Sequence, residues 1–113
     1  AVLRRRGNAG RTDSKSSRML QSGPLKLFAD EHRLVVARKE VFLTPTECRL
    51  MYLLILRAGR IQHRESLLHE IWGRRAGKTT RTLDVHVHRL RRKLEPEGER
   101  LETVVGIGYR LRP

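Results

Sequence analysis

The segment 80–94 does most to limit what this chain can fold into, because its side chains separate onto two faces of a helix. At about 100° per residue, a narrow stripe carries four aliphatic residues, Leu83, Val87, Leu90 and Leu94. The opposite side carries a mostly basic set with two residues at its margins: Arg81, Val85, Arg89 and Arg92, then Thr82 and His88. The pattern predicts a core helix whose outer face either enters a DNA major groove or is simply solvated.

Two shorter helices are predicted before this segment. The first begins at 44–47, where Thr-Pro-Thr-Glu supplies a capping threonine, a proline for the first helical position and a glutamate that completes a capping box. This helix is expected to run to about Arg57, and its interior over 50–56 is apolar on several sides, which is typical of a central helix. The second helix is expected from about Arg64 to Trp72.

Short β-prone runs flank the helices. Upstream, three runs predict about three small antiparallel strands that begin near Pro24: 25–29, 34–37 and 41–43. Two turns are expected between them: 30–32 and 38–40. Downstream, two runs around the glycine-rich turn at 106–108 predict a hairpin: 102–105 and 109–111. The predicted fold is α+β, a winged helix-turn-helix with a small N-terminal antiparallel sheet, a three-helix core and a C-terminal β-hairpin wing.

The charge of the chain is large and uneven. Its 113 residues hold 25 Lys and Arg against 12 Asp and Glu, a net charge of +13, which points to a polyanionic partner, nucleic acid or an anionic membrane surface. Nearly all of the excess lies in the segments 1–22 and 73–93. No apolar run approaches the ~18 residues of a membrane-spanning helix. The only cysteine, Cys48, excludes an intramolecular disulfide and is expected to be an inert buried thiol in a reducing cytoplasm.

Catalytic and ligand-binding motifs are not evident. The segment Gly77-Lys78-Thr79 lacks the glycine spacing of a phosphate-binding loop, and Gly106-Ile107-Gly108 lacks the third glycine of a dinucleotide fingerprint. His86 and His88 lie about 200° apart on a helix, so they cannot chelate one metal ion. No carboxylate pair or Ser/His/Asp arrangement emerges. We therefore expect no enzyme activity, no cofactor and no metal.

Four motifs in order resemble the DNA-binding effector domain of OmpR/PhoB-type response regulators. They are 43–47, 64–68 with 71–73, 81–94 and 103–111. With the leading strands, the resemblance covers about residues 24–112. It implies sequence-specific binding to double-stranded DNA and control of bacterial transcription, with the third helix in the major groove and the wing near the adjacent minor groove.

The resemblance also assigns contacts to individual residues. Four residues would lie against base edges: Thr82, Val85, Arg89 and Arg92. Seven would lie near phosphates: Trp72, Arg81, His86, His88, Arg91, Thr103 and Tyr109. The wing tip would be Val105, Gly106 and Ile107. A loop that in relatives can touch RNA polymerase would carry three basic residues: Arg74, Arg75 and Lys78.

The same resemblance implies a longer, two-component regulator. Residues 1–6 resemble the end of a receiver domain's last helix, 7–23 are expected to be a flexible linker, and 24–113 form the winged-helix domain. A sensor histidine kinase would act on the missing receiver domain. The isolated domain is expected to be a monomer that binds direct repeats as a tandem dimer, in the cytoplasm and away from membranes.

Three positions depart from the family pattern. Val105 stands where a basic wing residue is usual, which would weaken minor-groove readout there. His63 replaces the Ser or Thr that usually caps the second helix, so that cap is expected to be weaker or supplied otherwise. Cys48 replaces an aromatic residue in the first helix and is expected to change packing only.

Two other functions stay open at this point. A basic RNA-binding module would share the charge, although the chain has only two Phe, two Tyr and one Trp and does not group them for base stacking. A winged-helix protein-interaction domain with weakened DNA binding would share the fold and would explain Val105. Competition between structured RNA and duplex DNA separates the RNA-binding module from the first interpretation. A protein-interaction domain would show negligible affinity for duplex DNA even at low salt.

Overall fold

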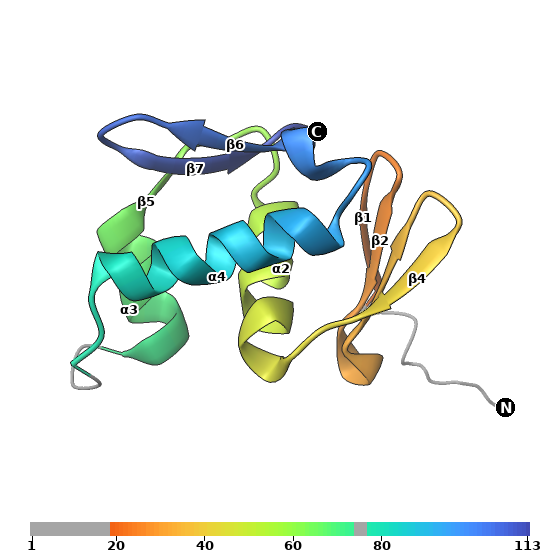
Figure 1. Cartoon of the computed structure of the whole chain (residues 1–113), viewed down its shortest axis with the longest axis horizontal. Coiled ribbons are helices and arrows are strands. Elements are labelled where there is room, and N and C mark those ends of the chain that lie inside the picture. Colours follow the sequence, from red (N-terminus) through yellow and green to blue (C-terminus); the bar gives the residue numbers. More distant parts are fainter. Residues whose placement is uncertain (1–18, 74–76) are drawn as a thin grey trace, which may run out of the picture.

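The computed structural model describes residues 19–73 and 77–113 (Figure 1). The predicted receiver-domain remnant at 1–6, most of the predicted linker, and Arg74 and Arg75 lie outside the described residues. The described elements form an N-terminal sheet, three α-helices and a second small sheet near the C-terminus. This arrangement is the predicted winged helix-turn-helix.

The N-terminal sheet has four antiparallel strands in the order β1-β2-β3-β4. They are β1 (Met19–Ser22), β2 (Leu25–Phe28), β3 (Arg33–Val36) and β4 (Lys39–Phe42). The sequence boundary at Pro24 was wrong, because β1 pairs with β2 along its whole length, from Met19 opposite Phe28 to Ser22 opposite Leu25. Two apolar residues followed by two polar ones give no alternation that distinguishes a strand from a linker.

The turns of this sheet also differ from the prediction. The expected turn at 38–40 was placed too far along the chain, since Lys39 and Glu40 belong to β4 and Val36 pairs with Lys39. A two-residue connection of this kind needs a left-handed residue, and Ala37 supplies it with φ 59°. The expected turn at 30–32 is the short 3₁₀ helix η2 (Ala29–Glu31).

The three helices match their predicted bounds closely. They are α2 (Pro45–Leu56), α3 (Arg64–Trp72) and α4 (Thr80–Lys93). The predicted capping box is present at α2: Glu47 N donates to Thr44 Oγ1 at 3.2 Å, and Thr44 N donates to Glu47 Oε1 at 2.9 Å. At α3, His63 makes no side-chain cap, as expected. Instead, the N–H of Arg64 donates to the carbonyl of Ile107 at 3.2 Å.

Removing this cap is expected to weaken the fold. Thr44→Ala leaves the N–H of Glu47 without its acceptor, so the free energy of unfolding should fall by about 1 kcal/mol. Urea unfolding of the purified domain measures this loss. Thr46→Ala removes a threonine from the same turn without touching the capping box. Equal unfolding midpoints for the two variants would contradict a stabilising role for the cap.

Glu47 also holds the far end of α4. Lys93 Nζ donates to Glu47 Oε1 at 2.6 Å and to the carbonyl of Phe42 at 3.1 Å. Burial raises the pKa of Glu47, but the hydrogen bond and charge of Lys93 and the hydrogen bonds of Thr44 outweigh burial and lower it overall. The start of α2, the end of β4 and the end of α4 are therefore joined at one carboxylate.

The second sheet forms the wing and attaches it to the helices. Its strands are β5 (Gln62–His63), β6 (Leu101–Val104) and β7 (Gly108–Leu111), in the order β5-β7-β6. Gly108 lets β7 approach β5, because a Cβ at this position would lie 1.9 Å from the carbonyl oxygen of Gln62. The hairpin β6–β7, here called the wing, runs alongside α4 in Figure 1.

The core lies between the sheets and the helices. The predicted stripe of α4 belongs to it, since the exposed fractions of Leu83, Val87, Leu90 and Leu94 are all 1% or less. Apolar residues from α2, α3 and both sheets complete one continuous cluster. This packing fixes which side of α4 faces solvent.

Candidate nucleic-acid interface

The outer face of α4 presents unpaired cationic side chains. Arg81, Arg89 and Arg92 are exposed, and within the described part of the chain they make no ion pair. Val85 lies among them with 43% of its surface exposed, and Thr82 is half-buried at the margin. The face thus offers arginine N–H donors around one apolar side chain. Arginine to guanine and an apolar side chain to the thymine methyl are the contacts that read base edges in the major groove.

Most of the described arginines outside this face are neutralised. Within residues 19–73 and 77–113, Arg38, Arg49 and Arg60 form no salt bridge, whereas six other arginines are paired with carboxylates: Arg33, Arg57, Arg64, Arg100, Arg110 and Arg112. If the basic face of α4 were only solvated, there would be no reason for its arginines to be unpaired while others form salt bridges. A surface that binds a polyanion requires cations that no carboxylate neutralises. The uneven pairing favours a phosphate-facing role for α4.

Trp72 and His86 meet at the junction of α3 and α4. Their rings form an edge-on contact with centroids 5.2 Å apart. His86 Nδ1 lies 2.9 Å from the carbonyl oxygen of Thr82, so that nitrogen carries a proton as the donor. A neutral His86 then presents only an acceptor at Nε2. The predicted phosphate contact by His86 therefore requires either its protonated form or a bridging water.

Arg91 and Thr103, both predicted to lie near phosphates, contact one another. The Arg91 guanidinium donates to the carbonyl of Leu101 through Nε (2.9 Å) and Nη2 (2.6 Å), and Nη2 also donates to Thr103 Oγ1 at 2.9 Å. These bonds tie α4 to β6. A phosphate could be reached only through the remaining N–H groups of Arg91, so its first role in the free domain is to hold the wing.

Tyr109 is similarly engaged. Its side chain is 6% exposed, and its hydroxyl donates to Asp84 Oδ1 on α4. Burial and this hydrogen bond raise the pKa of Tyr109 to about 12, so the hydroxyl keeps its proton at neutral pH. Arg64, at the start of α3, also binds Asp84, through Nε at 3.2 Å and through Nη2. The hydroxyl proton of Tyr109 is therefore already donated to a carboxylate, so the predicted phosphate contact would have to be made beside that hydrogen bond.

Sequence reasoning missed this group of Arg64, Asp84 and Tyr109. Arg64 was noted only as the start of a helix and of a motif, Tyr109 only as a phosphate contact, and Asp84 only as a negative charge and a member of the motif 81–94. The one available signal was that Asp84 is the single acid in an otherwise basic segment, 73–93. An acid there is unfavourable beside DNA unless it binds another protein group.

The wing tip is open and uncharged. Val105 is 89% exposed and Ile107 42% exposed, and Gly106 forms the turn with φ 78°. His88 on α4 and Lys78 before it are exposed. The wing tip therefore lies at the surface and carries no basic side chain, as expected from the presence of Val105 where a basic residue is usual.

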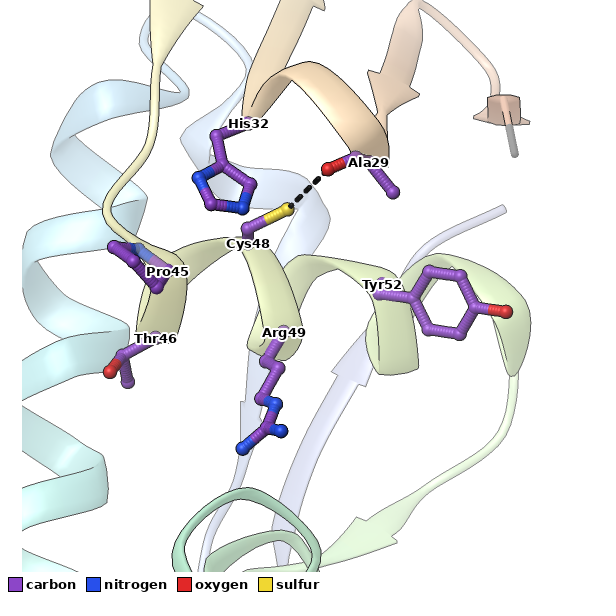
Figure 2. Close-up of a pocket in the computed structure, with 7 residues that line it drawn as sticks. All are labelled: Ala29, His32, Pro45, Thr46, Cys48, Arg49 and Tyr52. Carbon is purple, nitrogen blue, oxygen red and sulfur yellow. Dashed lines mark hydrogen bonds between the residues drawn. The ribbon is translucent and has the colours of Figure 1, made fainter. Parts of the chain in front are cut away.

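A surface hollow also lies away from α4. A pocket of about 540 Å³ lies between η2 and the start of α2, and Figure 2 shows its lining residues, including His32, Cys48, Arg49 and Tyr52. Cys48 is 6% exposed, and its Sγ lies 3.6 Å from the carbonyl oxygen of Ala29. The predicted burial of Cys48 is confirmed, and burial, followed by the charge of Asp30, raises the pKa of its thiol.

Within residues 19–73 and 77–113, no group of three or more His, Cys, Asp or Glu side chains is placed to hold a metal ion. No helix in these ranges has the length and apolar character needed to cross a membrane.

Comparison with known proteins identifies the family. The family model "Transcriptional regulatory protein, C terminal" matches residues 25–111. CseB of Streptomyces coelicolor, a transcriptional regulatory protein, is 39% identical over 99% of this chain and 50% of its own length. PhoB of Escherichia coli, the phosphate regulon transcriptional regulatory protein, is 38% identical over 76% of this chain and 38% of its own length. The chain thus spans half or less of these curated relatives.

A solved structure agrees with the sequence relatives. The DNA-binding domain of the response regulator AdeR, in complex with an intercistronic region, superposes with a TM-score of 0.71 at 29% identity. The match covers 81% of this chain and 96% of that one. The chain therefore belongs to the C-terminal domains of transcriptional regulatory proteins, the winged-helix DNA-binding effector domains of OmpR/PhoB-type response regulators that control transcription.

Proposed function

We propose that this domain reads specific duplex DNA sequences by placing α4 in the major groove and the wing toward the neighbouring minor groove. The observation that carries the proposal is the unpaired arginine face of α4, beside a wing whose hydrogen bonds fix it to the same helix. Four side chains would contact base edges: Thr82, Val85, Arg89 and Arg92. Within this set, Arg89 is the principal reader and Val85 meets a thymine methyl.

Phosphate contacts would supply affinity and register. The exposed residues Arg81 and His88 are the most available for them. At the junction of α3 and α4, Trp72 would contact the DNA backbone through its indole N–H, and His86 would do so in its protonated form or through a bridging water. Arg91, Thr103 and Tyr109 would contribute mainly by holding the wing, with any phosphate contact added to that role.

The whole regulator would extend this activity. The similarity to full-length regulators supports a receiver domain upstream of the described fold, controlled by a sensor histidine kinase in the cytoplasm. The domain would bind direct repeats as a tandem dimer and remain a monomer when free. The loop between α3 and α4, with Arg74, Arg75 and Lys78, would contact RNA polymerase. No catalytic role is assigned to the chain.

Selection from a random duplex library at two salt concentrations tests the proposal. The expected result is an enriched motif with a defined repeat spacing. A plot of the logarithm of the association constant against the logarithm of the salt concentration should have a negative slope of about 0.9 for each phosphate contact. Structured RNA is included as a competitor. Enrichment of no motif, or preference for RNA over every duplex, would overturn the proposal, and negligible duplex affinity even at low salt would favour a protein-interaction domain.

The wing tip gives a separate prediction. Val105→Arg adds a cation at the tip of the turn, where Val105 is 89% exposed. A narrow A·T minor groove has enhanced negative potential that attracts such a cation. We expect higher affinity for operators flanked by A·T tracts than for G·C-flanked operators, measured by fluorescence anisotropy. Val105→Gln, which lengthens the side chain without charge, is the control. Equal affinity of the wild type and Val105→Arg for A·T-flanked sites would mean that the tip does not reach the groove.

A further inference from the structure

Two residues on one flank of α4 anchor the wing. Asp84 and Arg91 lie seven positions apart, which places them two helical turns apart on the same side of the helix. Asp84 accepts from Tyr109 of β7, and Arg91 donates to Leu101 and Thr103 of β6. Each strand of the wing therefore has its own polar connection to α4. Two separated connections fix the angle between the wing and the helix, which one connection would leave free.

Asp84 differs from Arg91 because it joins a third element. Arg64, the first residue of α3, binds both oxygens of the Asp84 carboxylate. The backbone N–H of Arg64 donates to Ile107 in the wing turn. A surface hollow lined by His63, Thr80 and Ile107, among others, opens beside this junction. The start of α3, the flank of α4 and the wing thus meet around one carboxylate.

The negative charge of Asp84 lies within a basic surface. Asp84 is the only acid in 73–93, so it opposes the charge of the surface on which DNA would lie. The Arg64 guanidinium offsets this carboxylate and is itself occupied by it. An arginine held by a carboxylate makes a weaker phosphate contact than a free arginine, because its charge is already compensated. Asp84 therefore lowers the general attraction of this surface for DNA while it orders the elements that would read sequence.

We infer that Asp84 is a positioning residue that sets DNA specificity: through Tyr109 and Arg64 it holds the wing and the start of α3 against α4, and it withholds Arg64 from phosphates. The inference rests on the proposed sequence-specific binding. It assigns Asp84 no contact with DNA. Its signature is the ratio of operator affinity to random-duplex affinity, since loss of a positioning group lowers the first and release of Arg64 raises the second.

The test compares three variants on the selected operator and on a random duplex over a series of salt concentrations. Asp84→Asn keeps the size of the side chain and an oxygen for Tyr109, but releases Arg64. We expect the specificity ratio to fall roughly tenfold, within the range that coupled contacts show. For the random duplex, the slope of the logarithm of the association constant against the logarithm of the salt concentration should become steeper by about 0.9, the value for one added phosphate contact.

Tyr109→Phe removes one hydroxyl and no charge. A positioning role predicts weaker operator binding with unchanged binding to the random duplex. A direct phosphate contact by the hydroxyl predicts an equal loss on both duplexes. Since the ring stays in place, this variant keeps the test informative even if Asp84→Asn fails to fold, which thermal unfolding shows directly.

Glu70→Gln is the matched control. The Arg57–Glu70 pair is also doubly hydrogen-bonded, with side-chain exposures of 33% and 37% against 36% for both Arg64 and Asp84. Glu70→Gln changes the net charge equally and releases an arginine, but its pair joins α2 to α3 and involves neither α4 nor the wing hairpin. We expect an unchanged specificity ratio.

The outcomes separate the two claims. A wild-type domain without sequence preference overturns the proposed function and this inference together. A wild-type domain with a preference that Asp84→Asn and Tyr109→Phe both retain overturns only the inference. If Asp84→Asn and Glu70→Gln change the ratio of operator affinity to random-duplex affinity equally, the effect is one of net charge alone. That outcome also overturns the inference.

Discussion

Replacing Arg89 with alanine is expected to weaken binding to the selected operator by about 1–3 kcal/mol and to relax base preference at one position of the site. Arg89 is exposed on the outer face of α4 and forms no ion pair in the described part of the chain. Its guanidinium is therefore free to make the paired donor contact that a guanine edge accepts. Affinities for the operator, for single-base variants of it and for random duplex, measured at one salt concentration, test this expectation.

Arg38→Ala serves as the control for Arg89→Ala. Arg38 is an exposed arginine in the turn between β3 and β4, in the N-terminal sheet that Figure 1 places beyond the C-terminal end of α4. Both variants lose one positive charge. If Arg89→Ala lowered affinity for operator and random duplex by the same factor, Arg89 would be a phosphate contact and its base-reading role would be wrong.

Leu90→Ala is expected to lower the free energy of unfolding by about 2–5 kcal/mol, the largest effect on stability that we predict. Leu90 is fully buried in the stripe that holds α4 against the core. Truncation leaves a cavity that the packed neighbours cannot fill completely. A loss of this size is a large part of the stability of a small domain, so urea unfolding should show a much lower midpoint.

Leu56→Ala is the matched substitution for Leu90→Ala. Leu56 ends α2 with 52% of its surface exposed, so its truncation is expected to change the unfolding free energy by about 0.5 kcal/mol or less. Similar losses in the two variants would mean that the stripe of α4 is not the core contact described above. Salt dependence of DNA binding by the folded Leu90→Ala fraction should match the wild type, since the variant removes no phosphate contact.

The helices were predictable from sequence because their signals are local. The capping box over 44–47 and the aliphatic stripe of 80–94 each lie within one element, and both were confirmed. The strands were less predictable. The four residues of β1 give almost no periodic signal, and their assignment depends on pairing with β2. The turn at Ala37 depends on a left-handed backbone conformation, which an alanine in the sequence does not indicate.

The candidate interface divides in the same way. The outer face of α4 follows from helical periodicity, which needs only the sequence of that helix. The connections that hold the wing do not, because Asp84 meets residues 20 positions upstream and 25 positions downstream. Contacts at such separations follow from the tertiary fold. The sequence therefore predicted which side chains face outward, but not which of the remaining polar residues hold them in place.

The carboxylate of Glu47 gives the domain a response to acid that involves two helices at once. Its pKa is lower in the folded than in the unfolded chain, so its contribution to stability is complete above the unfolded value and is lost as the pH falls through the folded one. Protonation would remove the charge that pairs with Lys93 at the end of α4 and would weaken the acceptor of Thr44 N at the start of α2 in a single event. The C-terminal end of the helix that carries the arginine face would then lose its ion pair and keep the hydrogen bond from Lys93 to the carbonyl of Phe42. The same conditions would loosen the start of the central helix.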